Sequence, residues 1–221
     1  MRVSRDKAAE NRERIVDTAS RLFREKGFDG VGLDAIMKGA GLTHGGFYGH
    51  FESKDDLAAE AVTRALDRSM EKQRRFTDLD DLASDYLSER HRADRANGCA
   101  VAALGADIAR QSEGVRRGLT AHVRAQLDRF ARLLRHGTAA SRRKRAITTL
   151  AGMIGALTLA RAVDDPSLSN EILAAARDAF GKPPSARQEA SGRITPPRSA
   201  APPHRVRTNR AAPGAPDPVR S

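Results

Sequence analysis

A short polar stretch near the N-terminus carries side chains suited to contact a nucleic acid. Five of them occur within residues 43–54: Thr43, His44, Tyr48, His50 and Lys54. Hydroxyl, imidazole and ammonium groups donate hydrogen bonds to phosphate oxygens, and a helix that begins after Ser53 would add its free N–H groups. The chemistry of this stretch is therefore that of phosphate contact.

The same stretch contains Gly45, Gly46 and Gly49, which is unusual for a helix. Each glycine inside a helix costs about 1 kcal/mol relative to alanine. Close approach of the backbone to another surface is one reason to accept that cost. The glycines therefore favour a helix that lies against a partner.

Two short helices joined by a glycine turn would position these side chains. Apolar residues fall at the i, i+3 and i+4 positions of one helical face: Leu33, Ile36 and Met37. Gly39-Ala40-Gly41 then supplies residues that close a helix. Thr43 stands at the expected N-cap of a second helix, on which Phe47 and Phe51 form an i, i+4 apolar pair. This pattern predicts a helix-turn-helix, whose second helix enters the major groove; a helical hairpin that only packs is the alternative.

A first helix should support this motif. Its apolar stripe within about residues 9–26 consists of Ile15, Ala19, Leu22 and Phe23. Gly27 ends it, and Phe28 is expected to enter the three-helix core. Ahead of it, Arg2, Arg5 and Lys7 form either an arm that reaches DNA or a solvated terminus.

These residues together resemble the N-terminal DNA-binding domain of the TetR family of bacterial transcriptional regulators. The resemblance covers about residues 11–66. It rests on a first helix that ends in Phe23-Arg-Glu-Lys-Gly27-Phe28, followed by Gly41-Leu42-Thr43, Phe47-Tyr48, His50-Phe51, Ser53-Lys54 and Leu57. Two positions depart from the family pattern: Gly32 replaces the usual Ser or Thr, and Met37 replaces the usual alanine.

The resemblance implies roles for single residues. Those expected to face the DNA groove are Thr43, His44, Gly45 and Gly46. Those expected to hold phosphates are Tyr48, His50 and Lys54. Gly32 is still an acceptable N-cap, but it lacks the side chain that would touch phosphate.

The rest of the chain shows helical spacing without obvious strands. A capping-box-like Ser53-Lys-Asp-Asp56 opens a linking helix toward Gln73. Further helices are expected near residues 79–87, 101–108, 112–134, 141–163 and 166–180. The predicted fold is all-α, with a helix-turn-helix DNA-binding domain over residues 1–54, a helical ligand-binding and dimerisation domain over residues 55–181, and a tail over residues 182–221.

The helix expected at residues 141–163 is rich in small residues. They are Ala151, Gly152, Gly155, Ala156 and Ala160. Small residues permit close helix approach, and with the final helix they resemble the contribution that TetR-like proteins make to a four-helix dimer interface. A buried core helix would look similar, but a reader with one recognition helix per head usually needs two heads, which favours a homodimer.

Cys99 is the candidate sensor residue of the second domain. With Asn97 as N-cap, the thiol would lie in the first turn of a helix, where the helix dipole and Arg95 favour thiolate. A small buried apolar residue is the alternative. The expected effector-contacting residues are Cys99, Tyr86, His122 and Phe130. No metal site is expected, because His91, His122 and His136 are irregularly spaced.

Composition limits the remaining possibilities. The 221 residues carry a net charge of +11 and one cysteine. The longest apolar stretch, residues 147–160, is shorter than the ~20 residues that a bilayer requires, and no signal peptide is evident, so we expect a cytoplasmic protein. Residues 182–221 hold nine of the ten prolines with eight Lys/Arg against two Asp/Glu, which predicts a disordered basic tail.

Together these features predict a transcriptional regulator. No phosphate-binding glycine loop or nucleophile elbow is present, so an enzyme is not expected, and no cofactor is implied. The expected partners are double-stranded operator DNA, a second copy of the chain, and a small-molecule or electrophilic effector that releases a repressor from its operator. The alternative is a DNA-binding activator or architectural factor without an effector.

Overall fold

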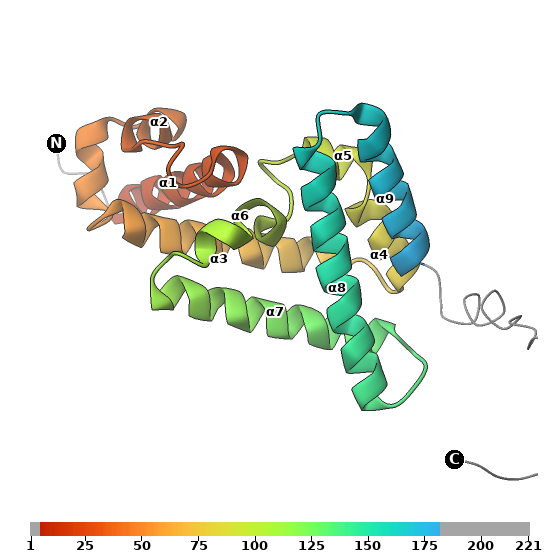
Figure 1. Ribbon diagram of the computed structural model, residues 1–221. Coiled ribbons are helices and arrows are strands. Elements are labelled where there is room, and N and C mark those ends of the chain that lie inside the picture. The colour runs from red at the N-terminus through yellow and green to blue at the C-terminus, as the bar shows by residue number, and fades with distance from the viewer. Residues whose placement is uncertain (1–4, 182–221) are drawn as a thin grey trace, which may run out of the picture.

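The computed structural model describes residues 5–181, and this part consists of helices and turns without a strand. The elements are α1 (Arg5–Lys26), α2 (Leu33–Gly39), η1 (His44–Gly49), α3 (Lys54–Gln73), α4 (Leu79–Tyr86), α5 (Glu89–Ala93), α6 (Ala100–Ile108), α7 (Glu113–Leu133), α8 (Ala139–Ala162) and α9 (Pro166–Phe180). Figure 1 shows α1, α2 and η1 at one end, with α3 leading from them toward the other helices. The predicted all-α fold is confirmed.

An apolar core joins the first three elements. Its aromatic members are Phe23, Phe28, Phe47 and Phe51. The rings of Phe23 and Phe28 lie 5.1 Å apart, and those of Phe47 and Phe51 lie 5.6 Å apart. Gly27 and Gly41 adopt φ of +76° and +69°, so each turns the chain where a side chain would be strained. The predicted entry of Phe28 into this core is confirmed.

The second element of the motif is a 3₁₀-helix and not the predicted α-helix. Gly46 N–H donates to the Thr43 carbonyl at 3.0 Å and His50 N–H to the Phe47 carbonyl at 2.9 Å, the three-residue spacing of a 3₁₀-helix. Glycines occupy half of the six positions in η1 and favour the α-helix poorly. The terminal methyl of Met37 lies below Gly46, so this departure from the family pattern is accommodated under a glycine.

The N-terminal core continues past residue 54 into later helices. It includes Leu57, Val62 and Leu66 of α3 together with Leu104 and Ile108 of α6. α7 runs along α3 below it, as Figure 1 shows. α3 and α6 therefore connect the first elements firmly to the helices that follow.

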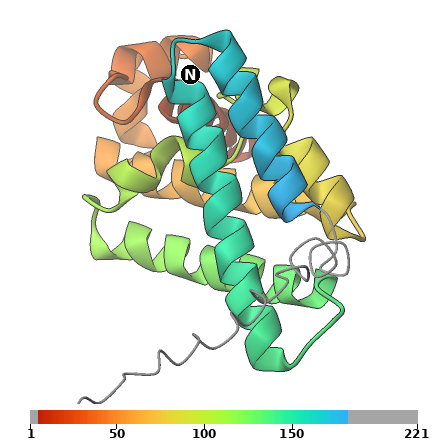
Figure 2. The same ribbon diagram turned by 45° about the vertical axis from the view of Figure 1, so that its right-hand side comes forward.

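Helices α8 and α9 lie side by side on the outer face (Figure 2). A Cβ at Gly152 would lie 2.1 Å from the Phe180 ring, so a side chain at this position would displace that ring of α9. Gly155 has open space instead. The small residues of α8 thus divide between packing inside the protomer and an outward face.

Some predicted features differ from the structure, and others concern residues outside the described range. α1 begins at Arg5, so Arg5 and Lys7 belong to a helix and not to an arm, and Lys7 forms an ion pair with Glu10. The sequence spacing did not predict α5, a helix of five residues. Arg2 and the predicted tail at residues 182–221 lie outside the described residues.

Candidate DNA-binding surface and effector cavity

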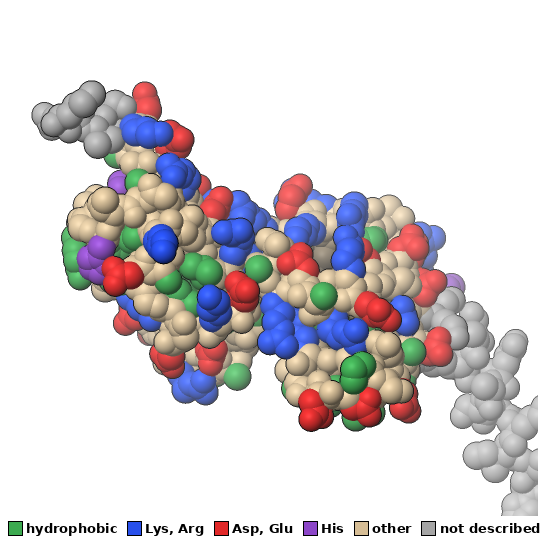
Figure 3. Space-filling view, turned by 90° about the horizontal axis from the view of Figure 1, so that it is seen from above, with side chains coloured by type: hydrophobic (Ala, Val, Ile, Leu, Met, Phe, Trp, Pro, Cys, Tyr) green, Lys and Arg blue, Asp and Glu red, His purple; other side chains and the backbone are tan. Residues whose placement is uncertain are grey.

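One face of η1 is solvent-exposed, and the other is buried in the core through Phe47. Phe47 is completely buried, whereas the residues exposed around it are Thr43, His44, Gly45, Gly46, Tyr48 and Gly49. Tyr48 is 68% exposed, which is unusual for a large aromatic side chain. Its ring packs edge-on against Phe47 at 5.2 Å. Sequence-predicted groove and phosphate residues thus share one surface, and the space-filling view shows histidine side chains at this end of the molecule (Figure 3).

A carboxylate holds one of the predicted groove residues. His44 Nδ1 lies 2.5 Å from Asp34 Oδ1, and Asp34 itself is on the exposed face of α2. The contact orients the imidazole and leaves Nε2 directed away from the carboxylate. The sequence analysis did not single out Asp34, although its position in the first turn of α2 could have drawn attention to it.

The predicted phosphate residues differ in burial and in the hydrogen bonds that they already make. His50 is the half-buried C-cap of η1. Lys54 Nζ donates to the Phe28 carbonyl at 2.7 Å, so one of its three donors already joins α3 to the end of α1. Ser53 caps α3 as predicted, since its hydroxyl accepts from the Asp56 N–H at 3.0 Å. Thr43 is the N-cap of η1 by position, but its side chain makes no cap hydrogen bond.

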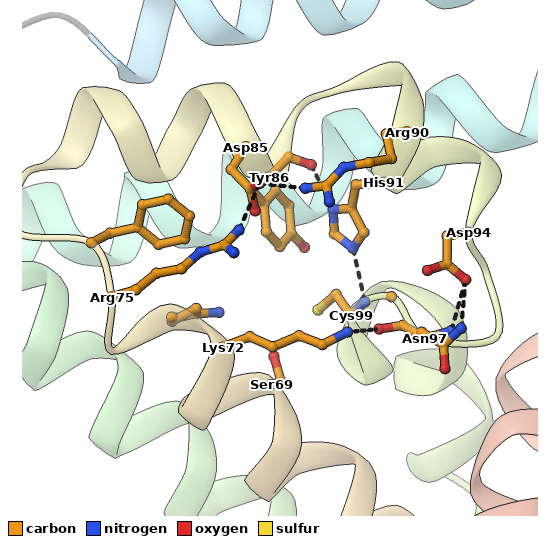
Figure 4. Close-up of a pocket in the computed structure, with 13 residues that line it drawn as sticks. Ser69, Lys72, Arg75, Asp85, Tyr86, Arg90, His91, Asp94, Asn97 and Cys99 are labelled. Atoms are coloured by element: carbon orange, nitrogen blue, oxygen red, sulfur yellow. Dashed lines mark hydrogen bonds and ion pairs between the residues drawn. The ribbon is translucent and has the colours of Figure 1, made fainter.

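A cavity of about 170 Å³ opens between α3, α4, α5 and the loop that precedes α6. Its wall includes Tyr86 and Cys99, two of the four predicted effector residues, together with Phe76 and Gln73. Figure 4 shows the Tyr86 hydroxyl directed toward Cys99, above the Lys72 side chain. Tyr86, Gln73 and Cys99 are each more than nine-tenths buried.

Two polar atoms of this wall lack a hydrogen bond within the described part of the chain. They are the Tyr86 hydroxyl and Gln73 Oε1. Burial raises the pKa of Tyr86 well above its ordinary value, so the phenol is neutral and can donate. A buried polar atom without a partner is energetically unfavourable unless a ligand or water satisfies it.

His91 holds the loop before α6 in place. Its Nδ1–H donates to the Tyr86 carbonyl at 2.6 Å, and its Nε2 accepts from the Cys99 N–H at 3.0 Å. Both ring nitrogens are used by the neutral form of the imidazole. Burial lowers the pKa of His91, in agreement with that form.

The loop is also bound to helices on several sides. Lys72 of α3 donates to the Asn97 carbonyl at 3.0 Å, and Arg24 of α1 donates to the Gly98 carbonyl at 3.0 Å. Arg24 is 5% exposed, and desolvation lowers its pKa to about 10, so it remains charged at neutral pH. Arg161 of α8 donates to the His91 carbonyl at 2.7 Å. α1, which supports η1, is therefore hydrogen-bonded directly to the cavity wall.

Two expectations about the effector residues change. The N-cap of α6 is Cys99 and not the predicted Asn97, and the Cys99 side chain makes no cap hydrogen bond. Asn97 is hydrogen-bonded to Asp94 instead. His122 and Phe130 do not line this cavity. Both are buried on α7, where Phe130 belongs to the core under α8 and α9 and His122 Nε2 has no partner among the described residues.

Several residues of the cavity were missed by the sequence analysis. Lys72, Gln73 and Arg75 lie at the end of the linking helix or just after it, where nothing in the apolar spacing distinguishes them. Arg24 follows Phe23 near the apolar stripe of α1, and its burial depends on the packing of the distant Gly98 loop. Such residues become visible only when distant segments are brought together.

The arrangement of α2 and η1, with one face of η1 exposed, is that of a helix-turn-helix motif. Residues 15–61 match the family described as "Bacterial regulatory proteins, tetR family". The matched segment lies within residues 11–66, over which the sequence resembles this family, so the resemblance is confirmed there.

Individual relatives are similar over short stretches. The HTH-type transcriptional regulator AcrR of Shigella flexneri is 42% identical over 59 residues, which span 27% of each chain. A Staphylococcus aureus regulator, SAUSA300_2515, is 40% identical over 63 residues, 28% of this chain and 34% of its own length. The chain thus spans about a third or less of the length of these relatives.

Solved structures extend the likeness to the rest of the fold. A TetR regulator from Chloroflexus aurantiacus superposes with a TM-score of 0.65 at 23% identity, covering 80% of this chain and 98% of the other. The reduced form of Escherichia coli NemR gives 0.61 at 22% identity, covering 77% and 94%. In the part of the chain that the structure describes, no helix combines the length and apolar character needed to cross a bilayer.

Proposed function

We propose that this protein is a homodimeric repressor that binds operator DNA through η1 and is released by a small-molecule or reactive effector in the second domain. The observation that carries this proposal is the exposed face of η1 on a buried Phe47 anchor. A 3₁₀-helix with three glycines presents its backbone to a partner without intervening side chains. Thr43, His44, Gly45 and Gly46 are the proposed groove residues; Tyr48, His50 and Lys54 are the proposed phosphate residues.

An exposed apolar stripe on α8 supports a dimer. At four-residue spacing it contains the exposed Ile147, Ala151 and Leu159 and the partly exposed Gly155, and Leu168 of α9 is also exposed. Residues at this spacing form one ridge of a helix, which packs into the groove of another. A second copy of the same surface would cover the ridge in a two-fold dimer.

The contacts around the cavity support regulation by an effector. A ligand between α3 and the Gly98 loop would act on the carbonyl groups that Arg24 and Lys72 hold. Arg24 belongs to α1, and α2 packs against α1. Displacement of the loop would therefore shift α1 and the elements that it positions. The effector would release DNA if it binds better to the displaced arrangement.

DNA binding is tested by fluorescence anisotropy with DNA from upstream of the protein's own gene. Tyr48→Phe should weaken binding to all operator variants alike, because it removes a phosphate contact. Thr43→Ala and His44→Ala should change the ranking of variants, because they alter base contacts. An unchanged ranking in both alanine variants would show that the groove residues are assigned wrongly.

The dimer is tested by sedimentation equilibrium. Wild-type protein should sediment as a dimer at micromolar concentration, and Leu159→Glu as a folded monomer with weaker operator binding. Thr148→Glu, at another exposed position of α8, is the matched control and should stay dimeric. A monomeric wild type would contradict the proposal.

A reactive effector would have to reach Cys99 through the cavity, because its side chain is buried. Operator affinity of wild type and Cys99→Ala should be compared before and after treatment with N-ethylmaleimide. Release of wild type alone would support Cys99 as the sensor. Equal behaviour of the two proteins would leave a reversible ligand as the effector.

A further inference from the structure

The charge around the cavity is unbalanced toward positive. Lys72, Arg75 and Arg90 line it, against Asp85 and Asp94. The single Oδ1 of Asp85 serves both arginines, at 2.9 Å from Arg75 and 2.5 Å from Arg90. Asp94 accepts from the main-chain and side-chain nitrogens of Asn97. The carboxylates are therefore already shared or engaged.

Two further cations lie behind the loop. Arg24 is buried and Arg161 is half-buried; both donate to main-chain carbonyl groups, and neither forms an ion pair with any residue that the structure describes. Lys72 is exposed and also forms no ion pair with a described residue; its Nζ donates to the Asn97 carbonyl and retains further donors. In a partly desolvated space such charges favour an anion more strongly than they would in water.

The wall provides two polar anchor points in addition to this charge. The neutral Tyr86 hydroxyl can donate, whereas Gln73 Oε1 can only accept, and both lack partners in the described structure. The aromatic rings of Phe76 and Tyr86 give the cavity apolar surface. A volume of about 170 Å³ is close to that of a cavity known to hold one benzene ring.

We infer that this cavity binds a small organic acid of about one aromatic ring, with its carboxylate at Lys72 and Tyr86 and a hydrogen-bond donor facing Gln73. The inference rests on the proposed function in naming the effector of the same second domain. A bound organic acid would provide partners for the Tyr86 hydroxyl and Gln73 Oε1, and its charge would offset the excess of positive charge. A large planar compound does not fit the volume.

The test measures binding directly and without DNA. Purified full-length protein is titrated calorimetrically with 4-hydroxybenzoate and with its neutral isostere 4-hydroxybenzamide. The acid should bind about tenfold or more tightly than the amide, because a charge-assisted hydrogen bond is lost in the amide. Equal binding of the two, or no binding of the acid at millimolar concentration, would overturn the inference.

Three variants locate the site. Lys72→Met removes the ammonium group and Tyr86→Phe removes only the hydroxyl; each should weaken binding of the acid about fivefold or more. Lys38→Met, at an exposed lysine on α2, is the matched control and should bind as wild type does. Unfolding temperatures verify that the variants fold. Wild-type affinity in both cavity variants would overturn the inference, and a protein that binds upstream DNA but not the acid would leave the proposed function standing.

Discussion

The proposed DNA-reading end and the proposed effector cavity place polar groups differently. Phe47 lies in a cluster of buried apolar side chains, and the polar side chains of η1 lie outside it. Around Tyr86 the cavity wall includes buried polar atoms without partners among the described residues, and the buried Arg24 holds the loop through the Gly98 carbonyl. The first arrangement fixes a rigid surface for a partner that binds outside. The second leaves interactions unsatisfied until something enters.

The largest expected effect is a loss of stability at the reading end. Phe47→Ala removes a completely buried ring and should lower the free energy of unfolding by about 3–5 kcal/mol. Tyr48→Ala, next to it but exposed, should change stability by no more than about 0.5 kcal/mol while weakening DNA binding. Urea denaturation with anisotropy on operator DNA measures both. Similar losses of stability in the two variants would contradict the division between inner and outer faces.

The next effect concerns the loop of the cavity wall. A Cβ at Gly98 would lie 2.7 Å from the Asp94 carbonyl oxygen and 2.8 Å from Arg161 Nη2, so Gly98→Ala should cost about 1–3 kcal/mol. The control Gly105→Ala meets only Val101 Cγ1 at 3.7 Å inside α6. It should stabilise the protein by about 0.5–1 kcal/mol. Thermal unfolding distinguishes them, and a tolerated Gly98→Ala would show that the loop is not tightly held.

A smaller effect with the opposite sign is expected at Gln73. Gln73→Met keeps the unbranched shape but removes a buried oxygen that has no partner among the described residues, so stability should rise by about 1 kcal/mol. An equivalent gain is not expected for Met37→Leu in the apolar core of the reading end. Denaturant midpoints of both variants test the contrast. A destabilised Gln73→Met would mean that this amide already has a partner.

The smallest effect is a dependence of stability on pH. Burial lowers the folded-state pKa values of His91 and His122, so below the unfolded value of about 6.5 the unfolded chain binds more protons than the folded one. Stability should therefore fall as the pH drops below about 6.5, by less than about 1.4 kcal/mol per pH unit for each histidine. Unfolding of wild type and His91→Gln at pH 7.5 and 5.5 checks this. An identical pH dependence in the variant would exclude His91 as a contributor.

The sequence predicted the reading end better than the cavity, for a physical reason. Phe47, Phe51 and the closing glycines act over short separations, so their spacing records the local fold. The cavity forms where Gln73, His91 and Gly98 come together from three segments of the chain. No local sequence pattern predicts these contacts. The 3₁₀ form of η1 was missed although its glycines were noted, because a weak helix former does not specify which helix replaces the α-helix.

Helix α3 has a geometric consequence for communication between the two ends. It begins at Lys54, bound to the Phe28 carbonyl, and ends with Lys72 and Gln73 at the cavity. Its 20 residues make a rod of about 30 Å. A pivot of about 5° at the cavity end would sweep the other end through about 2.6 Å. In a symmetric pair two such levers move in opposite directions, so the spacing of the heads would change by nearly twice the displacement of either one.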